Sequence, residues 1–311
     1  MNVTYKTLNK QGLDIHQTIY IPQGSLKAVV QINHGLAEHS ERYVDFATFL
    51  CNKGFAVYLH DHPGHGKSIN EKIPAGHLPW RGGWDMMLDV IHNINKTIRK
   101  KHPQIPVFLM GHSMGSLLSR YYNATFPMYF KGMLLSGTTE PDVATLKSLL
   151  SFIRINRIFR KQTYLHKLLN SFFYKSYNRT LKNTRTGFDW LSSNPEEVEK
   201  YINDPLCGFP LSMGFFKNLA QGSLQMVKAE KNLRFRKNFS TLIISGKDDP
   251  VGNYGKDPKL VEKKYINQGF YRTKLILLQG RHELLNEAED IRLKTYQTIE
   301  IFFEDKLMGN F

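Results

Sequence analysis

The feature that most constrains this chain is a short apolar run, Val107–Met110, that leads directly into Gly-His-Ser-Met-Gly at residues 111–115. The run has β-forming character, and the residues after it have helical spacing. The pattern therefore predicts a strand that turns sharply into a helix, with Ser113 at the turn. Both glycines are needed there because a Cβ would collide where strand and helix pass each other. Such a strained turn persists where function requires it.

Apolar strands and amphipathic helices alternate on both sides of this turn. We expect strands at Val3–Leu8, Asp14–Ile21, Ala28–Asn33, Phe55–His60, Gly132–Ser136, Ser240–Ser245 and Thr273–Leu278, and helices at Tyr43–Lys53, Trp84–His102, Pro258–Asn267 and Glu289–Phe303. The first two strands flank Gln11-Gly12 and predict an antiparallel hairpin at the edge of the sheet. The other strands are separated by helices, so we expect a mostly parallel sheet with helices on both faces.

The alternation stops after Gly137 and resumes at Ser240. Helical and loop patterns fill the interval from about Pro141 to Phe235, which indicates an insertion over the carboxyl edge of the sheet. We therefore expect an α/β core in two parts, residues 1–138 and 237–311, and an inserted helical cap at residues 139–236.

A serine nucleophile needs a general base, and the base needs an acid to orient it. Two loops that follow later strands supply candidates, and both lie at the carboxyl edge where Ser113 is expected. We predict that His282 is the base and that Asp249 orients it. Asp249 is preferred because Pro250 stiffens the turn beside it, but the neighbouring Asp248 stays open as an alternative.

The oxyanion of an acyl-transfer intermediate needs at least two backbone donors. The amide of Met114, directly after the nucleophile, is one candidate. The other is the amide of Leu36, in the loop His34–His39, where Gly35 lets the backbone approach closely. This chemistry requires neither a metal nor an organic cofactor, and we expect none.

A rival arrangement is the run His60-Asp61-His62 together with His65, whose spacing suits a metal ion. Pro63, Gly64 and Gly66 instead describe a tight turn beside the nucleophile, and no acidic or cysteine cluster elsewhere in the sequence completes a site. We therefore expect a structural turn and no metal at these histidines.

Several motifs together resemble monoacylglycerol lipases and bacterial lysophospholipases of the serine α/β-hydrolase superfamily. They are His34-Gly-Leu-Ala-Glu-His-Ser-Glu-Arg-Tyr43, Asp61-His-Pro-Gly-His-Gly-Lys-Ser68, Gly111-His-Ser-Met-Gly115, Gly246-Lys-Asp-Asp-Pro-Val251 and Gly280-Arg-His282. The resemblance covers residues 28–136 and 240–282 and fades in the insertion. It implies an α/β-hydrolase core with a helical cap and metal-free hydrolysis of acyl-glycerol or lysophospholipid esters. It also implies a triad of Ser113, Asp249 and His282, with Leu36 and Met114 forming the oxyanion hole.

The formal net charge of +15 is concentrated in the insertion, where residues 143–194 contain ten Lys and Arg against the single acid Asp189. Basic clustering of this kind attracts anionic lipid headgroups, nucleic acid or an acidic partner, or is simply a solvated face. The basic residues interleave with bulky apolar ones and match no nucleic-acid motif, so we expect contact with anionic membrane. We expect the apolar residues Phe152, Phe159 and Phe215 to contact an acyl chain.

Two other functions remain open at this stage. An aminopeptidase of the same superfamily would use the same triad and need an acidic anchor for a free amine. The candidates for that anchor are Glu196, Glu197, Glu199 and Asp204. The other is a non-catalytic basic protein that binds membrane or nucleic acid. Cys51 and Cys207 stand alone and no secretory signal is apparent, which favours a reducing, cytoplasmic location, peripheral to the membrane where the basic cap meets lipid.

Overall fold

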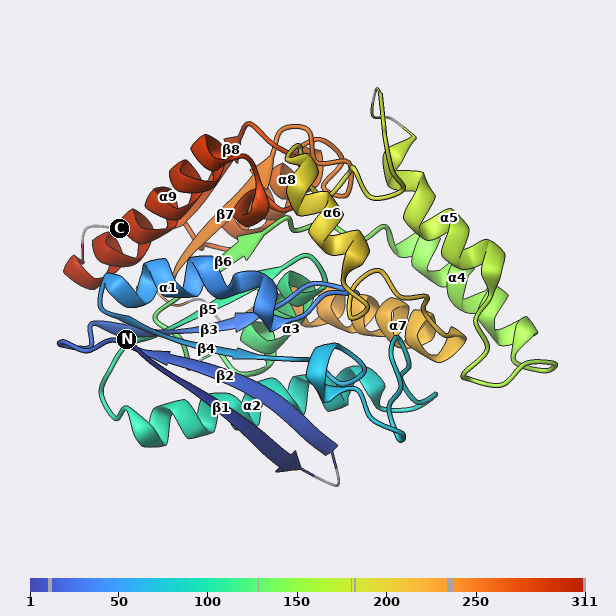
Figure 1. The fold of residues 1–311 in the computed structure, drawn as a ribbon, viewed down its shortest axis with the longest axis horizontal. Coiled ribbons are helices and arrows are strands. Elements are labelled where there is room, and N and C mark those ends of the chain that lie inside the picture. The colour runs from blue at the N-terminus through green and yellow to red at the C-terminus, as the bar shows by residue number, and fades with distance from the viewer. Residues whose placement is uncertain are drawn as a thin grey trace.

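The computed structural model describes residues 1–10, 13–127, 129–179, 181, 183–233, 236 and 238–309. Within these residues one sheet has the strand order β1-β2-β4-β3-β5-β6-β7-β8 (Figure 1). Its strands are β1 (Asn2–Lys10), β2 (Leu13–Ile21), β3 (Ala28–Asn33), β4 (Phe55–His60), β5 (Val107–His112), β6 (Gly132–Ser136), β7 (Ser240–Gly246) and β8 (Thr273–Leu278). The α-helices are α1 (Val44–Asn52), α2 (Gly83–Lys101), α3 (Met114–Thr125), α4 (Val143–Asn156), α5 (Lys167–Asn178), α6 (Pro195–Asn203), α7 (Met213–Glu230), α8 (Lys256–Asn267) and α9 (Glu289–Met308).

The pairing of the strands confirms the expected sheet. β1 pairs with β2, and β2 with β4, in antiparallel register, whereas β3 to β8 are parallel to their neighbours. The expected hairpin is therefore present at the sheet edge, although its turn at Gln11-Gly12 lies outside the described residues. The last helix runs five residues beyond its expected end at Phe303, because the charged residues that follow are still helix formers. Gly309 ends it in a left-handed conformation.

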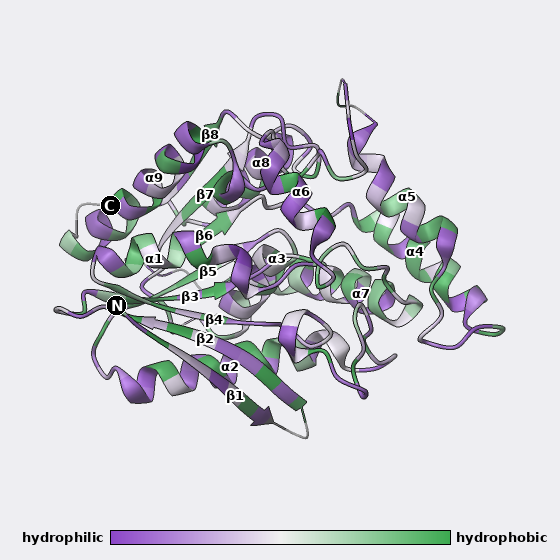
Figure 2. Cartoon of the chain, in the orientation of Figure 1, coloured by the Kyte–Doolittle hydropathy of each residue, from purple (hydrophilic) through white to green (hydrophobic). Residues whose placement is uncertain are grey.

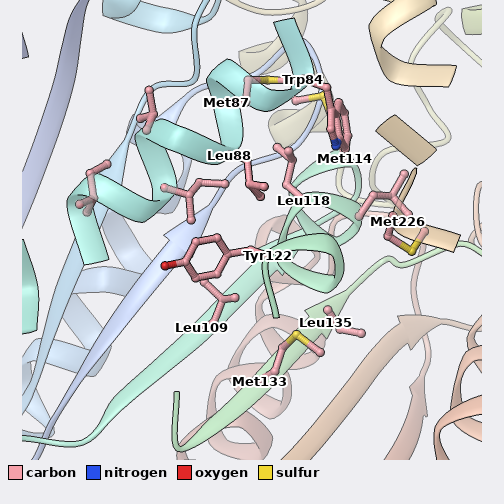
Figure 3. Close-up of a cluster of buried hydrophobic side chains, with 14 of the residues drawn as sticks. Trp84, Met87, Leu88, Leu109, Met114, Leu118, Tyr122, Met133, Leu135 and Met226 are labelled. Atoms are coloured by element: carbon pink, nitrogen blue, oxygen red, sulfur yellow. The ribbon is translucent and has the colours of Figure 1, made fainter. Parts of the chain in front are cut away.

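Each face of the sheet has its own hydrophobic core. On one face, side chains of α1 and α9 pack against the strands, as with Phe46 and Phe303. On the other face, α2, α3 and α8 cover the sheet, and α7 joins them. Figure 3 shows side chains of α2, α3, β5, β6 and α7 meeting there, with Trp84, Leu118 and Met226 among them. The parallel strands are buried on both faces, which explains their continuous apolar sequence.

The helices α4 to α7 lie between β6 and β7 in the chain, and Figure 1 shows α4 and α5 projecting beyond the sheet. These helices have polar caps. Asp142 accepts a hydrogen bond from the amide of Thr145, and Ser212 accepts one from the amide of Phe215. The division into a core and an inserted cap, with limits at 138 and 236, stays a prediction. Among the described residues, no helix combines the length and the apolar character needed to cross a bilayer.

A buried ionic cluster fixes the two ends of this insertion to the core. Arg120 of α3 is fully buried and donates to Glu230, the last residue of α7, and to Glu140, which precedes α4. Lys264 and Tyr265 of α8 contact the same carboxylates. The helix α3, which follows the candidate nucleophile, is thereby bound to the first and the last segments of the insertion.

Candidate active site

Ser113 occupies the sharp turn between β5 and α3 that the sequence predicts. Its backbone has φ 50° and ψ −119°, a conformation that side-chain-bearing residues rarely adopt. A Cβ on Gly115 would lie 2.1 Å from the carbonyl oxygen of Asn33, and one on Gly111 would lie 2.3 Å from that of Gly115. The two glycines therefore allow β3, β5 and α3 to approach closely, and the Ser113 amide completes the turn by donating to Ser136.

The loops after β7 and β8 bring Asp249 and His282 together. Oδ2 of Asp249 lies 3.0 Å from Nδ1 of His282, and both side chains are buried. The other carboxylate oxygen of Asp249 accepts a hydrogen bond from the amide of Val251, which holds the carboxylate in place. Asp248 is exposed and contacts Gln279 instead. Of the two candidate acids, only Asp249 contacts the histidine.

The environment of His282 suits a base that works near neutral pH. Burial lowers the pKa of His282, but the charge of Asp249 and its hydrogen bond to Nδ1 outweigh burial, so the pKa is raised above 6.5. A proton held on Nδ1 by the carboxylate leaves Nε2 as the acceptor in the neutral ring. The adjacent ring of His112 lies 4.7 Å away between centroids, and burial followed by the charge of His282 lowers its pKa to about 3.

Ser113 and His282 line the same cavity, of about 40 Å³. Gly137, at φ 55°, makes room for the imidazole, because a Cβ there would lie 2.9 Å from Cε1 of His282. The cap contributes Trp190, whose ring centroid lies 5.4 Å from that of His282 and whose carbonyl accepts from the His282 amide.

Of the two expected oxyanion donors, Leu36 belongs to the residue set that lines this cavity, and Met114 directly follows Ser113 in the chain. Leu36 lies in the loop after β3, and Met114 is the first residue of α3, where the amide has no partner within the helix. Behind the loop, Oε1 of Glu38 accepts hydrogen bonds from the amide of Gly35 and the hydroxyl of Tyr43. These contacts hold the loop against the nucleophile.

Two further buried carboxylates, Glu38 and Glu283, lie beside the triad candidates. Arg42 bridges Glu38 and Glu283, the residue after His282. Burial and then the charge of Glu283 raise the pKa of Glu38 to about 7, against the opposing effects of Arg42 and two hydrogen bonds. Burial also acts on Glu283, but Arg42 and His112 outweigh it and lower the pKa of that carboxyl. Glu38 and Arg42 stand in the motif that carries the resemblance, whereas no local pattern singles out Glu283.

The aromatic residues expected to contact an acyl chain lie away from this cavity. Phe215 is buried against His65 in the core, while Phe152 and Phe159 are 39% and 79% exposed. None of the three lines the cavity beside Ser113. The cap residues that do line it are Phe173, Tyr174, Tyr177, Trp190 and Leu191. Sequence analysis missed them because apolar residues at helical spacing do not show which face meets the core.

The histidines of the rival arrangement pack against one another. The rings of His34 and His62 lie 4.2 Å apart between centroids, and Nε2 of His60 lies 3.1 Å from Nδ1 of His62. Burial lowers the pKa of the three histidines of that arrangement and of His34, to about 4 for His60 and His65. Together with His34 they form a buried cluster of tilted and edge-on rings beside the loop that carries Leu36.

The acidic residues considered as an amine anchor lie outside the cavity. Glu197 pairs with Lys200, Glu199 with Arg185, and Asp204 with His39. The two carboxylates that do line the cavity, Glu38 and Glu283, are both paired with Arg42. An amine entering this cavity would therefore meet no unpaired carboxylate among the described lining residues.

The fold and this site define an α/β-hydrolase. A sequence profile of the family described as serine aminopeptidase S33 matches residues 24–289, and the chain belongs to this family. The expected monoacylglycerol lipase-like resemblance is confirmed by curated relatives. Mouse monoglyceride lipase is 34% identical over 213 residues, which are 66% of this chain and 62% of that protein. The monkeypox virus monoglyceride lipase homolog is 26% identical over 287 residues, covering 90% of this chain and 91% of that protein.

Solved structures agree on the fold. A thermostable carboxyl esterase from Bacillus coagulans superposes with a TM-score of 0.85 at 25% identity, covering 98% of both chains. A monoacylglycerol lipase from Paleococcus ferrophilus has a TM-score of 0.67 at 21% identity, covering 95% of this chain and 99% of that one. The mammalian alignments span about three-fifths of the relatives' own length.

Proposed function

We propose that this protein is a serine carboxylic-ester hydrolase that acts on single-chain lipids, monoacylglycerols or lysophospholipids. The observation that carries the proposal is the hydrogen-bonded pair of Asp249 and His282 in the cavity that Ser113 lines. The aromatic lining of that cavity suits an apolar acyl group, and the curated relatives include proteins named monoglyceride lipase.

The mechanism follows from the roles proposed for these groups. Oγ of Ser113 attacks the ester carbonyl while its proton passes to Nε2 of His282, and Asp249 stabilises the resulting imidazolium. The amides of Leu36 and Met114 donate to the oxyanion, and loss of one such donor typically costs about 10²- to 10³-fold in rate. His282 then protonates the departing alkoxide. A water molecule then attacks the acyl-enzyme while its proton passes to Nε2 of His282, and the imidazolium returns this proton to Oγ of Ser113 as the carboxylic acid leaves.

A chain-length series of p-nitrophenyl esters and monoacylglycerols, measured beside a proline naphthylamide, tests the proposal. Ester turnover should fall by several orders of magnitude in Ser113→Ala, and a fluorophosphonate should label the wild type but not this variant. Ser25→Ala, at an exposed serine, is the matched control and should keep both properties. Labelling that persists in Ser113→Ala would contradict the proposal.

The second candidate is an aminopeptidase, which the description of the matched family favours. It uses the same triad on an amide and requires a carboxylate for the free amine. Because Arg42 already pairs with both carboxylates that line the cavity, we propose the esterase as the main activity. Faster cleavage of the naphthylamide than of any ester would reverse this assignment.

We further propose that the cap contacts an anionic membrane surface. Side chains on and after α4 and on α5 are exposed despite being apolar, including Ile155 at 64%, Ile158 at 75% and Leu168 at 78%. Basic residues interleave with them, and Figure 2 shows the two hydropathy classes alternating along both helices. Apolar side chains bind at the bilayer interface, and cationic side chains are attracted to anionic headgroups. Salt screens the second contribution, so binding should weaken as the salt concentration rises. The expected cytoplasmic location is part of this proposal.

Vesicle sedimentation at low salt separates the two contributions. The variant Lys147→Gln/Arg154→Gln/Lys161→Gln removes three exposed charges and should weaken binding to anionic vesicles only. The variant Ile155→Gln/Ile158→Gln should weaken binding to neutral and anionic vesicles alike. Equal binding of the wild type to both vesicle types would contradict the electrostatic part.

A further inference from the structure

Three potential metal ligands meet where the cap contacts the core. His39 lies in the loop after β3, and Asp204 and Cys207 lie in the turn after α6. Their ligand atoms all lie within 4.8 Å of one another, and Nε2 of His39 is 2.7 Å from Oδ2 of Asp204. The imidazole and the thiol are buried, at 3% and 8% exposure. Because His39 is far from the other two residues in the sequence, only the folded chain brings the three together.

We propose that this cluster binds a zinc ion, or a cation of similar softness, which links the cap to the loop that carries Leu36. Thiolate, imidazole and carboxylate are the ligands that zinc prefers, whereas magnesium and calcium prefer oxygen alone. Three protein ligands and one water molecule complete a tetrahedral zinc site. The role assigned to the cation is to brace the cap, and it takes no part in ester cleavage.

The turn that presents two of the ligands is held by its own hydrogen bonds. Oδ1 of Asp204 accepts from the amide of Leu206 at 2.8 Å, which leaves Oδ2 to face His39. The amide of Cys207 donates to the carbonyl of Asp204 at 3.0 Å. These hydrogen bonds thus orient the carboxylate and the thiol before a cation arrives. Hydrogen-bond partners around metal ligands commonly have this role.

Access and charge also permit a cation. The Asp204 side chain is 29% exposed and opens onto a surface depression of about 280 Å³, through which a fourth, water ligand can enter. The nearby Arg42 does not repel a cation strongly, because Glu38 and Glu283 already pair with its guanidinium. On binding, the S–H bond of Cys207 breaks, a sulfur–zinc bond forms, and the proton leaves to the buffer. The imidazole proton moves from Nε2 to Nδ1.

A bound cation would help to fix the loop His34–His39, which carries Leu36, because that loop is already hydrogen-bonded to the same part of the cap. The carbonyl of Ala37 accepts from the hydroxyl of Tyr201 and from the amide of Gly208, both at 2.9 Å. A cation held by residues 39, 204 and 207 would replace the direct contact between His39 and Asp204 with bonds from one ion to both parts of the chain. Bound zinc should therefore raise the melting temperature, since it binds the folded chain only.

Calorimetric titration of chelator-treated protein with zinc chloride tests the proposal. We expect one tight site in the wild type, at least about tenfold weaker binding in Cys207→Ser and in Asp204→Asn, and no response to magnesium. Cys51→Ser is the matched control, because Cys51 is also buried but lies in α1 and is not part of the cluster. Equal zinc affinity in wild type and Cys207→Ser would overturn the proposal, as would loss of the site in Cys51→Ser.

Cobalt substitution tests the wild type without any variant, should Cys207→Ser fail to fold. A cobalt adduct at this site must show a thiolate-to-metal charge-transfer band and the strong visible absorption of tetrahedral coordination. Zinc should then abolish both by competition. An adduct without the thiolate band would overturn the proposal.

Discussion

Nδ1 of His282 lies 3.0 Å from Oδ2 of Asp249, although 33 residues of chain separate them. The contact depends on β7 and β8 being parallel neighbours, because each residue sits in the loop at the carboxyl end of its strand. The same edge carries Ser113 at the end of β5. The common direction of β5 to β8 thus places all three residues at one edge of the sheet.

The first prediction concerns the orienting acid. Asp249→Asn should lower kcat by about 10³- to 10⁴-fold, because the amide favours the wrong tautomer and no longer stabilises the imidazolium. Asp248→Asn is the matched control one residue away. Its side chain is exposed, so ester turnover should stay within about twofold of wild type. Comparable losses in both variants would refute the assignment of Asp249.

The second prediction concerns the pH profile. The base works only when His282 is neutral, so activity should fall as the pH drops through a pKa raised above 6.5. Plotting kcat/KM against pH reports that pKa for the free enzyme. In Asp249→Asn the negative charge that raises the pKa of His282 is gone. The fall of kcat/KM on the acid side of the pH profile should therefore move to lower pH. A fall that stays in place would show that another group controls it.

The third prediction concerns the ionic cluster that holds the cap. Arg120→Met leaves Glu230 buried without its main partner and should cost about 3 to 5 kcal/mol in the free energy of unfolding. Lys27→Met breaks the partly exposed pair with Glu304 and should cost less than about 1 kcal/mol. Urea denaturation measures both. Similar midpoints for the two variants would contradict a special role for Arg120.

The fourth prediction concerns the buried histidine cluster of His34, His60, His62 and His65. Unfolded, a histidine binds its proton near pH 6.5, whereas burial lowers the pKa of folded His60 and His65 to about 4. Between these values the unfolded chain binds more protons, so stability should rise with pH by up to about 1.4 kcal/mol per unit for each group. His282 and Glu38, whose pKa values are raised, act in the opposite direction but are fewer.

Urea midpoints measured from pH 4 to pH 7 check this expectation. His65→Phe replaces a ring that already packs between Phe209 and Phe215, and it removes one titrating group. Its midpoint should therefore depend less steeply on pH than that of the wild type. A wild-type midpoint that is constant over this window would contradict the prediction.

Much of this protein is determined by local sequence. The strands of the sheet and the turn at Ser113 follow from apolar periodicity and from the two glycines beside the serine, because these act over a few residues. The order of strands and helices then favours a parallel sheet, which places the loops of Asp249 and His282 at one edge. For this reason the candidate triad could be named before any coordinates were known.

The residues that line the cavity and the meeting of His39 with Asp204 and Cys207 were decided by tertiary structure alone. The sequence favoured Asp249 over Asp248, but only the structure shows that Asp249 contacts His282. Each depends on which way a side chain points or on how the cap lies over the core, and apolar residues at helical spacing do not specify either. Sequence analysis treated Cys207 as solitary and Asp204 as part of a distant acidic group. The folded cap places both against the loop after β3, because packing between distant segments fixes positions that no local pattern encodes.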